Sequence, residues 1–197
     1  LIANMIYTDG LVSLFAFGGI YAAGTFGWNT IQIGSFGILL ALAGTIGAWL
    51  GGKFDDRLGS KTVIIASLTI LLASVGAILL ISRDSIFFIP VTPPERGSAL
   101  FSAPAERAYL VLGFLIGLAA GPLQAASRSL LIQMAPKERI AQYFGLFALT
   151  GKVTSFIGPL LIGFITAITA NQKAGMAILV VFFVAGLALV MRVKPNR

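Results

Sequence analysis

The sequence predicts an all-α integral membrane protein with six transmembrane helices. Three observations support this prediction: the mean hydropathy is +0.95, only 11% of the residues are charged, and apolar runs of membrane length recur along all 197 residues. A soluble domain carries about 25% charged residues, whereas a spanning helix needs about 20 predominantly apolar ones. We therefore expect the lipid bilayer to surround this chain.

Six segments have the length of a spanning helix, and they cover residues 2–26, 31–52, 62–82, 108–134, 141–169 and 175–192. Residues 83–107, between the third and fourth segments, contain Pro90, Pro93, Pro94 and Pro104 and are expected to form an irregular extracytoplasmic connection. This connection separates a first three-helix repeat, 1–82, from a second repeat with the C-terminus, 108–197. Such a three-plus-three arrangement is typical of inverted repeats in secondary transporters.

Lysine and arginine predict the orientation, because loops rich in these residues stay in the cytoplasm. One side of the predicted topology holds the larger set: Lys53, Arg57, Lys61, Lys137, Arg139, Arg192, Lys194 and Arg197. The other side holds Arg83, Arg96, Arg107 and Lys173. We expect both termini to lie in the cytoplasm.

Composition also excludes several functions. The chain contains no cysteine and no histidine, so disulfides, thiol nucleophiles, histidine-based triads and most transition-metal sites are excluded. The net charge of +7 is explained by the basic loops, and no basic face with interleaved aromatic residues exists outside the spans. We expect no enzyme activity, no cofactor, no metal and no nucleic-acid partner.

Charged residues at membrane depth are costly and usually face a cavity or an ion-pair partner. Asp9, in the first span, lies about 12 Å deep if Leu1 is at the boundary. It is a candidate for proton or cation coupling, for a gate ion pair, or for a purely structural pair with a basic residue. Lys152, in the fifth span, is too deep to reach the interface easily and should point into water or towards Asp9.

The fourth span combines a glycine ladder with a polar face on one side, formed by Gly113, Gly117, Gly121, Gln124 and Arg128. Pro122 predicts a kink in this span, and Pro159 predicts one in the fifth. A broken helix with a polar face favours a substrate cavity, with tight packing as the alternative for the glycines. Asp9, Arg128 and Lys152 together would give a site with one acid and two bases. Its net positive charge would suit an anionic or carboxylate-bearing solute.

The second span carries a stripe of small residues within an arc of about 140°: Gly34, Gly37, Ala41, Gly44, Gly47, Ala48 and Gly51. Such stripes let two helix backbones approach closely. We favour static packing, with a sliding interface as the alternative.

The stretch that follows resembles the cytoplasmic loop signature of the major facilitator superfamily, through Gly52, Asp56, Arg57, Gly59 and Lys61. Ser60 stands where the signature has the first of two basic residues. The resemblance implies a loop between the second and third helices of a six-helix half. It also implies a latch that helps to hold the cytoplasmic side closed.

A narrower resemblance covers nearly all the chain except residues 83–107 and the last helix. Tyr7-Thr8-Asp9-Gly10, Gln124 to Ser129 and Gly151 to Ser155 resemble the branch named after the fungal autophagy-related vacuolar amino-acid effluxer. This resemblance implies the C-terminal half of a twelve-helix transporter of amino acids or similar metabolites, completed by an N-terminal six-helix half. It also implies that the first and fourth helices line the cavity and that the second and fifth meet the other half.

Two rival interpretations stay open. The chain could be a self-contained six-helix protein that dimerises, or a structural or regulatory membrane protein that keeps the fold without transporting. Within the transporter interpretation, the sequence leaves the solute, the coupling ion (a proton is one option) and the direction of transport open.

Overall fold

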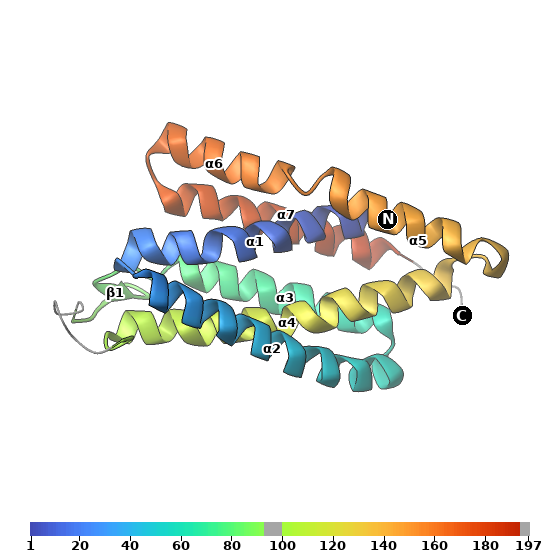
Figure 1. Ribbon diagram of the computed structural model, residues 1–197, viewed down its shortest axis with the longest axis horizontal. Helices are drawn as coiled ribbons and strands as arrows, with labels where there is room; N and C mark the ends of the chain where they lie inside the picture. The colour runs from blue at the N-terminus through green and yellow to red at the C-terminus, as the bar shows by residue number, and fades with distance from the viewer. Residues whose placement is uncertain (93–99, 194–197) are drawn as a thin grey trace.

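The computed structural model describes residues 1–92 and 100–193 as helices that run back and forth along one long axis (Figure 1). Six helical stretches in this part are long and apolar enough to cross a membrane, which confirms the predicted fold class. The predicted positions Pro93, Pro94 and Arg96 of the connection, and Lys194 and Arg197 at the C-terminus, lie outside the described residues. The start of the first helix, the end of the last helix and the turn between the second and third helices lie at the same end of the bundle, called the terminal end below.

The first three helices are α1 (Ile2–Phe26), α2 (Thr30–Leu58) and α3 (Ser60–Leu79). The expected loop at residues 53–61 is therefore not a loop, because α2 runs through the charged stretch to Leu58 and Gly59 alone separates the helices. Gly59 has φ +82°, a conformation that glycine adopts without steric cost. The charged residues mark the point where the chain leaves the membrane, but they do not mark the end of the helix. Lys, Arg, Asp and Phe are all compatible with a helix that continues into water.

The connection after α3 contains a two-residue β-hairpin. Strand β1 (Ser85–Ile86) pairs with β2 (Ile89–Pro90), and Phe87 and Phe88 form the turn with φ of 48° and 68°. A Phe-Phe turn lacks the glycine or asparagine that usually marks such a hairpin, so the sequence predicted only irregular structure. Helix α4 (Pro104–Met134) then starts at Pro104 instead of residue 108, because proline suits the first helical position, where no N–H bond is needed.

The fifth span consists of two helices in line. The short 3-10 helix η1 (Lys137–Arg139) leads into α5 (Ile140–Val153), and α6 (Ile157–Thr169) follows after residues 154–156. Pro159 is the third residue of α6, where its missing N–H breaks no intrahelical hydrogen bond. By contrast, α4 runs without interruption through Pro122. Helix α7 (Gln172–Arg192) completes the bundle beside α1 and α3.

The glycines of α2 and α4 form a close contact between the two helices. A Cβ atom at Gly121 would overlap the carbonyl oxygen of Gly44, and one at Gly47 would overlap that of Leu118. Gly51 packs against the ring of Pro122. The outer part of the stripe is different, because Gly34 and Gly37 have no neighbouring atom within 4 Å of a built Cβ.

A buried carboxylate holds the opposite end of the bundle together. Glu106 of α4 is 3% exposed and accepts one hydrogen bond from the indole N–H of Trp28 (2.9 Å) and one from the backbone N–H of Ala103 (3.1 Å). Trp28 also packs edge-on against Tyr109 and Phe36. These contacts join the turn between α1 and α2 to the start of α4.

Candidate functional site

A polar cavity of about 420 Å³ lies between α1, α4 and α5. Three of the four predicted cavity residues meet there, namely Gln124, Arg128 and Lys152. The other lining residues come from the same three helices: Asn4, Tyr7, Thr8, Leu11, Leu123, Ser127, Phe144, Phe147, Ala148 and Gly151. The cavity falls within the range of about 300–1,000 Å³ typical of small-molecule sites.

The cavity is more positive than the sequence predicted. Among the described residues, its lining contains two cations, Arg128 and Lys152, and no acidic side chain. Both cations are exposed, as is Gln124. Their positions follow from helix geometry: Gln124 and Arg128 are one turn apart on α4, and Lys152 lies in the last turn of α5. Such a site has hydrogen-bond donors and positive charge to offer a carboxylate.

Asp9 lies outside the lining of this cavity, and of its three predicted roles the ion pair with a base is not seen among the described residues. Its side chain is 3% exposed, and Oδ1 accepts a hydrogen bond of 3.0 Å from the hydroxyl of Thr154. Within the part of the chain that the structure describes, Asp9 forms no ion pair. Asp9 therefore lies against the break between α5 and α6. Its partner Thr154 stands there, two residues after Lys152.

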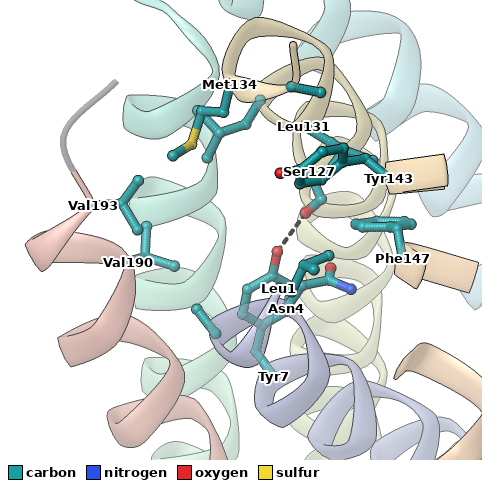
Figure 2. A pocket seen from close by; sticks show the side chains of 13 residues that line it. Leu1, Asn4, Tyr7, Ser127, Leu131, Met134, Tyr143, Phe147, Val190 and Val193 are labelled. Carbon is teal, nitrogen blue, oxygen red and sulfur yellow. Dashed lines mark hydrogen bonds between the residues drawn. The ribbon is translucent and has the colours of Figure 1, made fainter. Parts of the chain in front are cut away.

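A second cavity of about 330 Å³ adjoins the first near the start of α1 and the end of α7. Its lining is mainly apolar and includes Leu131, Met134, Val190 and Val193 (Figure 2). The two cavities share Asn4, Tyr7, Ser127 and Phe147 in their walls. The shared wall is crossed by a hydrogen bond of 2.7 Å between the hydroxyls of Tyr7 and Ser127, drawn as a dashed line in Figure 2.

The direction of this hydrogen bond follows from proton counting. The Ser127 hydroxyl has one proton and donates it to the carbonyl oxygen of Leu123, one turn back in α4. The Tyr7 hydroxyl is therefore the donor to Ser127. Tyr109, near the start of the antiparallel α4, donates its hydroxyl proton to the carbonyl oxygen of Gly18 in α1. Each of the two helices thus donates one tyrosine hydrogen bond to the other.

The predicted latch residues lie at the terminal end of the bundle, and one of them already has partners. Lys61 Nζ donates to the carbonyl oxygens of Met191 (2.9 Å) and Val193 (2.6 Å), at the end of α7. Gly52 is open to its surroundings, and Asp56 and Arg57 are exposed. In the described ranges, neither Asp56 nor Arg57 forms an ion pair, and no side chain caps the start of α3.

Several residues of the site were not singled out by sequence reasoning. Sequence reasoning identified residues by the cost of burying a charge in the membrane, and Asn4, Tyr7 and Ser127 are uncharged. Thr154 is also uncharged and, like Tyr7 and Ser127, stands within a family motif. Its spacing of two residues from Lys152 could have drawn attention to it, but its contact with Asp9 spans 145 residues and depends on the packing of α1 against α5.

Comparison with known proteins shows the family of this chain. Residues 1–197 match the family described as "Vacuole effluxer Atg22 like". Autophagy-related protein 22 of Cryptococcus neoformans is 29% identical over 100% of this chain and 34% of its own length, and that of Candida glabrata is 26% identical over 100% and 34%. An uncharacterized MFS-type transporter of Bacillus subtilis, YxiO, is 31% identical over 41% of this chain and 19% of its own length.

The fold has a counterpart among solved structures. The inward-open xylose transporter XylE from E. coli superposes with a TM-score of 0.75 at 12% identity, over 98% of this chain and 46% of that one. The chain spans about one third of the length of the fungal relatives. Since the family match covers every residue, the chain belongs to the family described as "Vacuole effluxer Atg22 like".

Proposed function

We propose that this chain is the C-terminal half of a secondary transporter that moves a small carboxylate-bearing solute by alternating access. The observation that carries the proposal is the cavity with two cations and no acid in its described lining. An amino acid or a similar metabolite fits this chemistry, because Arg128 and Lys152 can bind its carboxylate while Gln124 and Asn4 offer neutral hydrogen bonds.

An N-terminal six-helix half is the proposed partner. The fifth span and α2 are the least buried of the described spans. In their most apolar stretches, 11% and 22% of the residues are buried. These are the helices that the superfamily resemblance assigns to the contact with the other half. The length of the relatives also supports a partner half, since this chain covers only 34% of the Cryptococcus protein.

The proposed location is the inner membrane of a bacterial cell, with both termini in the cytoplasm. The basic residues at the terminal end support this orientation. In this orientation the apolar cavity of Figure 2 opens towards the cytoplasm, and the stretch from Gly52 to Lys61 acts there as the proposed latch. Residues 1–82 and 108–197 are the proposed inverted repeats, with three spans each.

Exchange of radiolabelled amino acids in proteoliposomes tests the function. The full-length protein should exchange labelled for unlabelled solute, and Arg128→Ala and Lys152→Ala should each raise KM about 10- to 100-fold. This range corresponds to the loss of a charged hydrogen bond worth about 1.5–3 kcal/mol. Carboxamide analogues of the same solutes should compete poorly with the labelled amino acid for exchange by the wild-type protein.

Lys137→Ala is the matched control, because Lys137 is an exposed lysine of η1 that does not line the cavity. If both cavity variants exchange amino acids as the wild type does, the cavity proposal is wrong. If the wild-type protein exchanges no solute under any condition, the non-transporting interpretation is favoured.

A further inference from the structure

The hydroxyl of Thr154 has two acceptors at equal distance. Its Oγ1 lies 3.0 Å from Asp9 Oδ1 and 3.0 Å from the carbonyl oxygen of Thr150, one turn back in α5. A hydroxyl carries one proton, so it can donate to only one of these oxygens at a time. While Thr154 donates to one of the two oxygens, its contact with the other is not a donated hydrogen bond. Which oxygen receives the proton can change with the protonation state of Asp9.

Both protonation states of Asp9 are hydrogen-bonded in this arrangement. When the carboxylate is charged, Thr154 donates to Asp9. When Asp9 is protonated, its O–H can donate to Thr154 Oγ1, and Thr154 then donates to the carbonyl of Thr150. No heavy atom has to move, so a proton can bind or leave without stranding a buried polar group, a loss that would cost about 1–3 kcal/mol.

Glu106 shows that the other described buried carboxylate is built differently. It is also 3% exposed, but its two oxygens face the indole N–H of Trp28 and the backbone N–H of Ala103. Neither N–H group can accept a hydrogen bond, so neither contact can reverse. A reversible partner is thus a specific property of Asp9.

The surroundings of Asp9 hold few charges. Helix α6 has no ionisable side chain, and α7 has Lys173 and Arg192 at its two ends. From α5 and α4, Lys152 and Arg128 line the polar cavity, and neither forms an ion pair with Asp9 in the described structure. Tyr7 of α1 and Tyr143 of α5 complete the titratable groups near these cavities. The carboxyl of Asp9 therefore has a hydroxyl partner and no fixed counter-charge.

Asp9 also contacts the segment that carries Lys152. Thr154 lies at the C-terminal end of α5, two residues after Lys152. On the other side of the break, Gly158 packs against the Ser13 side chain and the backbone carbonyl of Asp9. The hydrogen bond of Asp9 thus fixes the end of α5, and a change at Asp9 acts first on the neighbourhood of Lys152.

We propose that Asp9 and Thr154 form a proton-binding site that couples proton movement to solute transport. One proton binds the Asp9 carboxylate from one side of the membrane and leaves to the other side as the transporter changes conformation, and no other bond forms or breaks. Thr154 positions the carboxyl and links its state to Lys152. This inference rests on the proposed transport function.

The test compares two modes of transport by the full-length protein in proteoliposomes. Counterflow of a radiolabelled amino acid at equal pH on both sides needs solute binding and conformational change, but no net proton movement. Accumulation driven by a pH gradient needs coupling as well. We expect Asp9→Asn to keep counterflow and to lose gradient-driven accumulation at least tenfold, together with the solute-induced pH change reported by an entrapped pH dye.

Three further variants sharpen the result. Thr154→Val removes the reversible partner at nearly constant volume and should lower accumulation relative to counterflow, whereas Thr154→Ser should restore the wild-type ratio. Glu106→Gln is the matched control, a buried carboxyl outside both cavities, and should keep the wild-type ratio. If Asp9→Asn fails to insert, the Thr154 pair decides the question alone.

The outcomes separate this inference from the transport proposal. Wild-type counterflow without any response to a pH gradient would overturn the proton site and leave transport standing. Gradient-driven accumulation that survives in Asp9→Asn or is equal in Thr154→Val and Thr154→Ser would do the same. Absence of both modes in the wild type would overturn the proposed function itself.

Discussion

The hydroxyl of Tyr7 donates a 2.7 Å hydrogen bond to the hydroxyl of Ser127, and this contact joins α1 to α4 in the wall between the two cavities. Both side chains are buried, at 4% and 6% exposure. The bond therefore competes little with water. It connects the two helices that line the polar cavity.

Tyr7→Phe should lower stability by about 1 kcal/mol, the usual net value of one hydrogen bond. Ser127 keeps its own donation to Leu123, so no donor is left unpaired. Thermal unfolding of the purified protein in detergent measures the change. Tyr143→Phe is the control, because Tyr143 lines the same apolar cavity and its hydroxyl has no partner among the described residues. Equal losses in both variants would show that the hydrogen bond contributes nothing specific.

Gly121→Ala should destabilise the α2–α4 contact by about 1–3 kcal/mol, the usual cost of overpacking. The added methyl group would overlap the Gly44 carbonyl oxygen, and backbone atoms cannot turn aside as a flexible side chain can. Gly37→Ala, in the open part of the α2 stripe, should leave stability unchanged or raise it by up to about 1 kcal/mol through helix propensity. Melting temperatures of the two variants should therefore move in opposite directions or differ clearly in size.

Lys61→Met should loosen the C-terminal end of α7. The ammonium group now binds two carbonyl oxygens that have no helical partner, and a cation at this position is worth about 0.3–1 kcal/mol. Hydrogen exchange of the last turn of α7 should become faster, while that of α1 should not change. Lys137→Met removes a charge from the same end of the bundle without touching α7 and should leave the exchange rates as they are.

Glu106→Gln should weaken the contact with Trp28, because a charged acceptor is replaced by a neutral one. The difference between charged and neutral hydrogen bonds is about 1 kcal/mol. The chain has two tryptophans, so Trp49→Phe leaves Trp28 as its single fluorophore. In that background, the emission maximum of Trp28 should shift when Glu106 is changed. An unchanged spectrum and melting temperature would contradict the proposed contact.

The arrangement of the six spans could be predicted from the sequence because the bilayer imposes a simple rule. Apolar runs of fixed length must be helices, and charged residues mark where the chain leaves the membrane. The same rule identified Gln124, Arg128 and Lys152 as cavity candidates, since each is too polar to face lipid, and they line one cavity. The hairpin at Phe87 and Phe88 and the helical state of residues 53–58 escaped this reasoning, because hydropathy carries no information on backbone conformation in water.

The partners of the buried groups were decided by the tertiary structure alone. For Asp9, the sequence left open proton or cation coupling, a gate ion pair and a structural pair with a base. The hydrogen bond of Asp9 to Thr154 depends on how α1 lies against the break between α5 and α6, where Gly158 permits close approach. By itself, the sequence determined which residues must avoid lipid. The packing of helices distant in the chain determined which of them meet, because a contact between residues 9 and 154 requires a geometry that no local pattern encodes.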